Sequence, residues 1–156
     1  MAALRRGVRL GFIAGSDTHG GRPGGSAKEP LGYWGGLAAV WAEELTRRDL
    51  FDALRRRQTY ALTGARIILR FTVNGAPMGS ELPGGDQADI RIDAWTPGRL
   101  AKVELMKNAE VLRVFHPDGD ECHLQVEDAP GGPAFYHVRI TQTDGELAVC
   151  SPVWIG

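Results

Sequence analysis

The chain has 156 residues, of which 43% are hydrophobic, and 18 Lys and Arg side chains balance 19 Asp and Glu side chains to a net charge of -1. This length allows one hydrophobic core or two small ones. The balanced charge excludes the broad positive field that binds nucleic acid or an acidic membrane, so we expect neither partner. No apolar stretch approaches the roughly 20 residues that span a bilayer, and no signal core follows the basic N-terminus. We therefore expect a cytoplasmic protein, or a periplasmic one if a missing N-terminus carries a signal.

The first predicted element is a strand over residues 8–14, VRLGFIA, a nearly continuous apolar run that stops at a polar cluster. This pattern is typical of a strand buried on both faces of a parallel sheet. The strand leads into Asp17 and His19, so both side chains would leave its carboxyl end, where α/β sheets and barrels gather their reactive groups. A strand of this kind without neighbours exposes apolar surface, and we expect the chain to self-associate to cover it.

A long loop and a helix follow. Residues 15–36 are rich in glycine and lack any period, which predicts a loop of the kind usually kept for function. Residues 46–58 predict a helix, because Thr46 and Asp49 resemble a capping box and arginines occupy the last turn. Leu50, Phe51 and Leu54 form its apolar face.

From residue 67 onward, short β-rich runs alternate with turns such as Asn74-Gly75. The runs are residues 67–73, 88–95, 101–107, 111–116, 123–127, 135–142 and 147–155. Apolar and polar side chains alternate within them, which indicates strands with one buried face. Seven short strands at this spacing predict a β-sandwich. The predicted fold is therefore α+β, with a boundary near Gly64 between a first part, residues 1–64, and a sandwich, residues 65–156.

Asp17 and His19 are the candidate metal ligands. In an extended segment, side chains two residues apart share one side and can face the same divalent ion. A hydrolytic metal site needs at least three protein ligands and a water, so this pair is incomplete by itself. An Asp that caps the loop beside a surface His explains the same two residues without a metal.

The sequence around this pair resembles a known family. LGFIAGSDTHGGRPG, residues 10–24, is similar to the last metal-binding motif of the PHP (polymerase and histidinol phosphatase) superfamily, in a branch described as a domain of unknown function. The resemblance continues through residues 35–67. It also covers FTVNGAPMGSEL, VELMKNAEVL and YHVRITQTDGELAVCSPVWI further along the chain.

The resemblance implies a distorted β/α barrel whose mouth holds divalent metals that activate water against phosphate esters. It places metal ligation on Asp17 and His19, and a substrate contact on Arg22, whose guanidinium suits phosphate or carboxylate. The family's other ligands have no counterpart here, and no catalytic residue is assigned. We therefore expect residues 1–64 to be the end of such a barrel, followed by an Ig-like sandwich, in a chain that is inactive alone. The complete protein would hold zinc or manganese and act on a small phosphorylated or other anionic substrate, whereas this fragment need hold no metal.

A second hypothesis is a non-catalytic β-sandwich module, because residues 65–156 make up most of the chain. Such a module binds a protein or a carbohydrate, or has only a structural role. The tryptophans suit sugar stacking but also suit a core or a seam between domains; they are Trp34, Trp41, Trp95 and Trp154.

The remaining histidines and the cysteines favour structural roles. His116, His123 and His137 lack the spacing of a metal site, which favours ordinary sheet residues. Cys122 and Cys150 lie in predicted strands and fit buried free thiols better than a disulfide.

Overall fold

The computed structural model describes residues 2–16 and 35–156, and its fold is mostly β. Two short helices, α1 (Ala2–Arg5) and α2 (Arg47–Arg55), accompany twelve strands within these residues. The strands are β1 (Leu37–Val40), β2 (Thr59–Leu62), β3 (Ile68–Val73), β4 (Ala76–Pro77), β5 (Glu81–Leu82), β6 (Ala88–Trp95), β7 (Leu100–Lys107), β8 (Glu110–Phe115), β9 (Glu121–Asp128), β10 (Ala134–Gln142), β11 (Leu147–Cys150) and β12 (Val153–Ile155).

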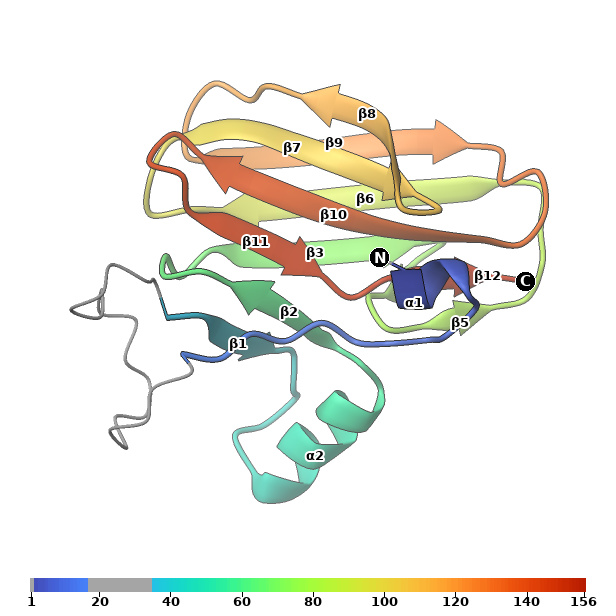
Figure 1. Cartoon of the computed structure of the whole chain (residues 1–156), viewed down its shortest axis with the longest axis horizontal. Coiled ribbons are helices and arrows are strands. Elements are labelled where there is room, and N and C mark those ends of the chain that lie inside the picture. The colour runs from blue at the N-terminus through green and yellow to red at the C-terminus, as the bar shows by residue number, and fades with distance from the viewer. Residues whose placement is uncertain (1, 17–34) are drawn as a thin grey trace.

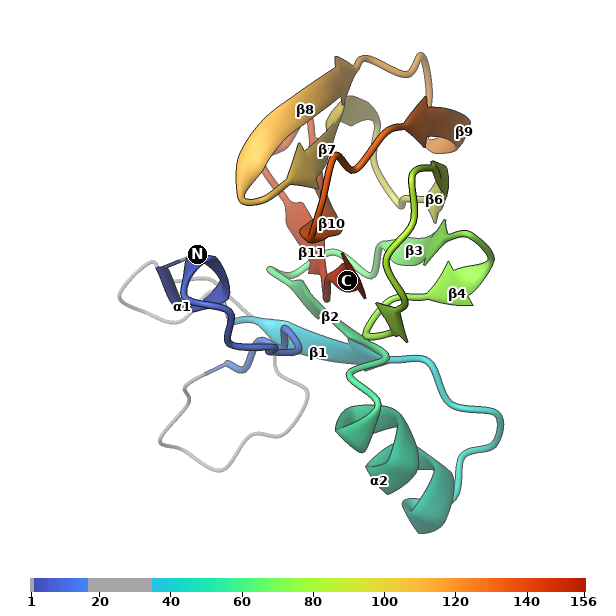
Figure 2. The ribbon, with the colours of Figure 1, turned by 90° about the vertical axis from the view of Figure 1, so that its right-hand side faces the viewer.

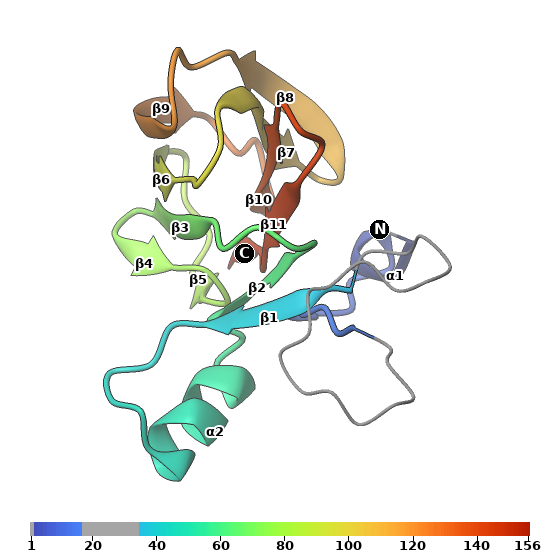
Figure 3. The same ribbon diagram turned by 90° about the vertical axis from the view of Figure 1, so that its left-hand side faces the viewer.

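The strands form two sheets that pack face to face (Figure 1). One sheet has eight strands in the order β1-β2-β11-β10-β12-β5, with β7 pairing with β10 and β8 with β7. The other has four strands in the order β4-β3-β6-β9. Figures 2 and 3 show the sheets edge-on, with α2 projecting beyond the sandwich next to β1. The predicted β-sandwich is confirmed.

The core lies between the sheets because the strands alternate buried and outward side chains. On β6, Ile90, Ile92 and Ala94 are fully buried, and the residues between them point outward. Val138 and Ile140 face them from β10 on the opposite sheet. Burying such a side chain contributes about 1.5–3 kcal/mol, so this double layer is the main source of stability.

All seven predicted strands are present, and the structure adds detail at the end of the chain. The run 147–155 is divided into β11 and β12 by Ser151 and Pro152. Pro152 has no N–H to donate to a ladder, which explains the break. The predicted turn at Asn74 and Gly75 joins β3 to β4, and both residues have a positive φ.

The helix predicted over residues 46–58 is α2. Thr46 is its N-cap and accepts a hydrogen bond from the Asp49 N–H at 3.1 Å. Its apolar face does not pack on the sandwich: Phe51 and Leu54 are 57% and 46% exposed, and the preceding Leu45 is 91% exposed. The helix therefore presents apolar surface to solvent.

The strand predicted over residues 8–14 is wrong. These residues form an extended segment without strand pairing, and Val8, Leu10 and Ile13 are 46%, 41% and 60% exposed. An apolar run is buried on both faces only where neighbouring strands flank it, and no described strand does so here. The predicted parallel sheet is therefore not found among the described residues. Most of the predicted loop 15–36 lies outside them.

The chain on both sides of Gly64 contributes to one sheet. β1 and β2 form an antiparallel hairpin, and β2 pairs with β11 from the end of the chain. Glu146 fixes the connection after β2, because its carboxylate accepts hydrogen bonds from the N–H groups of Gly64 and Ala65 at 2.6 and 2.8 Å. Burial alone would raise the pKa of Glu146, but the hydrogen bond from the Thr63 hydroxyl and these two backbone bonds together hold it below its usual value. The boundary at Gly64 stays a prediction.

Among the described glycines, Gly79 leaves the least room for a side chain. Its φ is +89°, and an added Cβ would lie 2.2 Å from the carbonyl oxygen of Arg56. Gly79→Ala should therefore lower the free energy of unfolding by more than about 3 kcal/mol in urea denaturation. Gly75→Ala is the matched control: its φ is +77° with nothing within 4 Å of an added Cβ, so the backbone cost alone is about 1–2 kcal/mol. Equal losses in the two variants would refute the steric explanation.

Candidate functional site

The predicted site residues Asp17, His19 and Arg22 lie outside the described residues. Their metal and substrate contacts therefore stay predictions. The structure does describe the chain that leads into them, residues 7–16, and the point at which the chain returns, residues 35–36.

Residues 7–16, here called the N-terminal segment, run across the outer face of the eight-stranded sheet (Figure 1). The Phe12 N–H donates to the Ser151 hydroxyl at 2.8 Å, and that hydroxyl donates to the Thr59 carbonyl at 2.7 Å. Arg9 forms an ion pair with Glu81 and donates to the Gly156 carbonyl at 3.1 Å. The segment is therefore tied to β2, to β5 and to both ends of β12.

The segment and the start of β1 meet closely at the point where the predicted motif begins. The Gly36 N–H donates to the Gly15 carbonyl at 3.1 Å. A Cβ on Gly36 would lie 2.6 Å from the Cβ of Ala14, so only glycine fits there without a shift. The two ends of the chain stretch that carries Asp17 and His19 are thus fixed next to each other.

His137 lies beneath this segment and is fully buried. Its ring contacts Phe12 edge-on and stacks on Phe135, with centroid distances of 5.9 and 6.2 Å. Its Nδ1 has no hydrogen-bond partner within the described residues. Burial, with a smaller effect of the Arg139 charge, lowers the pKa of His137 to about 4. The imidazole is therefore neutral at pH 7, as suits a structural residue.

Both cysteines are free and buried, in agreement with the prediction. Burial raises the pKa of the Cys150 thiol to about 12, and it also raises that of Cys122. Because the thiolate is the reactive form, neither side chain is a candidate nucleophile.

No group of three or more His, Cys, Asp or Glu side chains in residues 2–16 and 35–156 is placed to hold a metal. His116 contacts the Ala101 carbonyl oxygen through Nδ1 at 3.0 Å. His123 contacts the Asp93 carboxylate through Nδ1 at 2.6 Å, on the outer face of the four-stranded sheet. No local sequence pattern predicts this pair, because its members are 30 residues apart and only the β6–β9 register aligns them. The alternation on β6, which sends Asp93 outward, was the available signal.

Among the helices that the structure describes, none is long and apolar enough to cross a membrane.

Comparisons with known proteins identify a family model and relatives whose descriptions assign no activity. A family model described as "Protein of unknown function (DUF3604)" matches residues 27–83. An uncharacterized protein of Chlamydia trachomatis serovar D is 35% identical over 175 residues, which cover 99% of this chain and 28% of that protein. An uncharacterized protein of Chlamydia pneumoniae is 34% identical, over 97% of this chain and 28% of its own length. The chain thus spans little more than a quarter of these relatives. No solved structure matches it significantly.

The buried neutral His137 predicts acid sensitivity. Because its folded-state pKa of about 4 lies below the ordinary value of 6.5, the unfolded chain binds the extra proton between these values. Above pH 6.5, His137 does not change the free energy of unfolding. As the pH falls from 6.5 toward 4, protonation of His137 in the unfolded chain lowers the free energy of unfolding by up to about 3 kcal/mol. We expect His137→Leu to remove most of this loss in urea denaturation at pH 7 and pH 4.5. His116→Leu, which changes an exposed histidine, should retain it, and equal pH dependence in both variants would contradict the assignment.

Proposed function

We propose that this chain is part of a larger metal-dependent hydrolase, a phosphoesterase that resembles the PHP superfamily, in which the β-sandwich is a non-catalytic module. The observation that carries the proposal is the N-terminal segment, which exposes Val8, Leu10 and Ile13 immediately before the Asp17 and His19 pair. Three large apolar side chains exposed within six residues favour a surface that another polypeptide body covers.

A second apolar surface supports the same view. Leu45, Phe51 and Leu54 of the α2 region line a hollow of about 460 Å³ together with Leu50 and the helix N-terminus. The relatives have the additional chain that such surfaces need, since the matched region is 28% of their length. In this proposal that additional chain packs against both surfaces and supplies the rest of the barrel.

Only the residues before β1 would belong to the proposed barrel. β1 and β2 extend the sandwich sheet by antiparallel pairing, so they are not barrel strands. The N-terminal segment and the stretch that carries the Asp17 and His19 pair are the elements that would join the barrel.

The proposed sandwich is Ig-like, and the strand order supports this. β3, β6 and β9 are neighbours in one sheet, and β11, β10, β7 and β8 are neighbours in the other. Lettered along the chain as A, B, C, C′, E, F and G, with no counterpart of strand D among the described strands of these sheets, the two sheets read A-B-E and G-F-C-C′. That is the division found in immunoglobulin-type sandwiches.

The proposed chemistry divides between this chain and the rest of the protein. Asp17 and His19 would supply one carboxylate and one imidazole to a zinc or manganese ion, which lowers the pKa of a bound water and offsets charge on a phosphoryl group. Arg22 would contact the anionic substrate. Because two ligands do not complete a hydrolytic site, the chain alone should be inactive.

The test of this function uses the longer Chlamydia trachomatis relative. Replacing the residues that align with Asp17 and His19 by Asn and Ala should lower metal-dependent hydrolysis of p-nitrophenyl phosphate by at least about a hundredfold. The matched control replaces the residue that aligns with His116 by Ala and should leave the rate unchanged. Undiminished turnover in the double variant would refute the assignment of this pair.

The exposed N-terminal segment also predicts self-association of the isolated chain. Sedimentation velocity should show a dimer or larger species that dissociates on dilution, because association covers the exposed apolar side chains. The triple variant Val8→Ser, Leu10→Ser and Ile13→Ser should weaken it at least about tenfold. Val111→Ser and Val114→Ser, which change exposed side chains on β8, serve as the control. A wild-type chain that stays monomeric at every concentration would contradict the prediction.

A further inference from the structure

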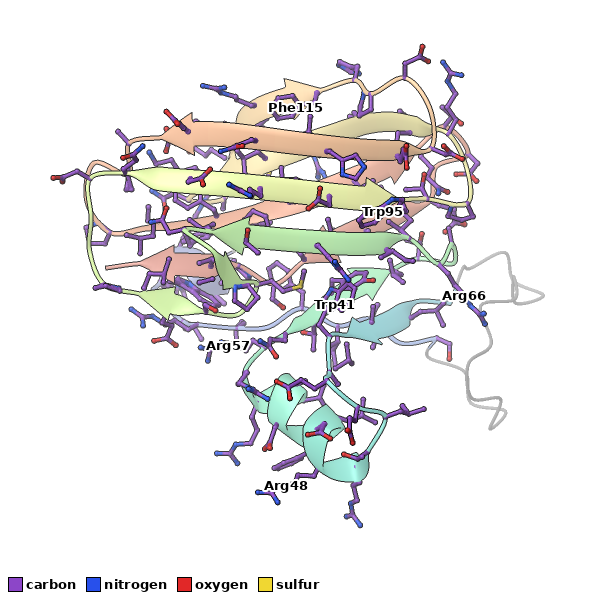
Figure 4. All side chains as sticks on the ribbon, turned by 180° about the vertical axis from the view of Figure 1, so that it is seen from behind. Trp41, Arg48, Arg57, Arg66, Trp95 and Phe115 are labelled. Atoms are coloured by element: carbon purple, nitrogen blue, oxygen red, sulfur yellow. The ribbon has the colours of Figure 1, made fainter. Side chains whose placement is uncertain are left out.

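The outer face of the four-stranded sheet carries a row of polar side chains set by the strand register. Arg70 on β3 pairs with Asp93 on β6, and Asp93 pairs with His123 on β9. All three point away from the core, because the residues on either side of each on its strand are turned toward it. Figure 4 looks onto this face, which no described element covers. The row is therefore open to a ligand.

Trp41 extends the row beyond β3. Its indole N–H donates to the Leu69 carbonyl at 2.9 Å, and the Arg70 guanidinium lies 5.0 Å from its ring centroid. These two contacts fix the orientation of the ring. Next to it is a mainly apolar hollow of about 280 Å³, whose lining includes Arg70, Thr72 and Met78.

A second hollow lies across β6. It has a volume of about 230 Å³ and is lined by Arg91, Asp93, His123, Leu124 and Gln125. The two hollows adjoin, because Arg70 and Thr72 of the first are the register partners of Asp93 and Arg91 of the second. At about 4.8 Å between strands, the row from β3 to β9 spans about 10 Å, which suits a short oligomeric ligand.

Trp95, the last residue of β6, places a second aromatic ring beside the polar row (Figure 4). It contacts the His123 ring edge-on at a centroid distance of 5.3 Å. Its register partner Ile68 is 48% exposed, so this end of the face is apolar. The Nδ1 of His123 is occupied by Asp93 at 2.6 Å, which leaves Nε2 as the ring nitrogen available to a ligand.

The charges on this face favour a neutral ligand. Arginines and carboxylates alternate along β6, where Arg91 lies between Asp89 and Asp93 and forms an ion pair with Asp89 at 3.7 Å. Glu121 and Glu127 add negative charge on β9. Such a mixture repels neither sign strongly and creates no positive field for a polyanion. It does offer donors and acceptors close together, which is what hydroxyl groups require, since each hydroxyl both donates and accepts.

We propose that the outer face of the four-stranded sheet binds a neutral carbohydrate. Trp41 and Trp95 supply flat apolar surfaces for the C–H faces of sugar rings. Asp93 accepts hydrogen bonds from hydroxyls, and Arg70, Arg91 and His123 fix their positions. Because the existing contacts already order Trp41 and His123, binding loses little side-chain freedom.

The experiment is an NMR titration of the full chain with three neutral probes, cellotetraose, xylotetraose and maltotetraose, at up to millimolar concentration. At least one probe should bind saturably and shift the indole N–H signals of Trp41 and Trp95, while that of the buried Trp154 stays unchanged. His123→Ala and Arg91→Ala should each weaken binding at least about tenfold. No saturable shift at this face with any probe would overturn the proposal, as would binding that both variants leave unchanged.

The controls separate this face from the rest of the protein. Arg113→Ala changes an exposed residue on β8 of the other sheet, and His116→Ala changes the exposed residue that follows this strand; both variants should leave sugar affinity unchanged. A sulfated polysaccharide such as heparin should not compete, and competition by it would overturn the choice of a neutral ligand. The proposal is independent of the hydrolase function: Asp17→Asn with His19→Ala in this chain should retain sugar binding, even if the corresponding double variant of the longer relative loses metal-dependent hydrolysis.

Discussion

The structure depends on the burial of alternate side chains between two sheets. A strand sends every second residue to the core, so the residues that fill the core also determine which residues reach the outer faces. On β10, Tyr136 and Val138 face inward, and His137 between them is turned to the outer face. On β6, Ile92 and Ala94 face inward, and Asp93 between them is turned to solvent. Both outer surfaces of the protein follow from this single constraint.

The two outer faces have different environments. The face of the eight-stranded sheet is partly covered by the N-terminal segment, which makes His137 and Phe135 buried rather than exposed. The described face of the four-stranded sheet has no such cover and carries charged and aromatic side chains. A sandwich of this kind can join another body through one face and retain a free binding surface on the other. This arrangement is consistent with both the proposed place in a longer hydrolase and the proposed carbohydrate site.

The N-terminal segment contacts the sandwich and leads along the chain into the Asp17 and His19 pair. Its backbone is fixed to the sandwich through Ser151, yet Val8, Leu10 and Ile13 point to solvent. The segment therefore has one side bound to the module and one apolar side without a partner in the described structure. The Asp17 and His19 pair follows directly along the chain, so in the proposed hydrolase a further body that packs on the segment would also bring the remaining metal ligands toward this pair.

The sequence by itself determined the parts of the structure that depend on local pattern. Period-two alternation, turn residues such as Asn74 and Gly75, and the Thr46 cap predicted seven strands and α2 in their places. These features need only near neighbours along the chain, so a sequence pattern captures them.

Tertiary structure alone decided which elements pair and which residues meet. The sequence pattern of residues 8–14 does not distinguish a strand in a parallel sheet from a segment across the outside of a sandwich. The burial of this apolar run depends on neighbouring strands that the local pattern cannot identify. The short strands β1 and β2 were missed for the same reason. β2 pairs with β11, which joins residues more than 80 positions apart, and β1 enters the sheet only by pairing with β2. The contact between Asp93 and His123 likewise exists only through the β6–β9 register. Local pattern determined the strands of this protein, and long-range pairing determined its surfaces.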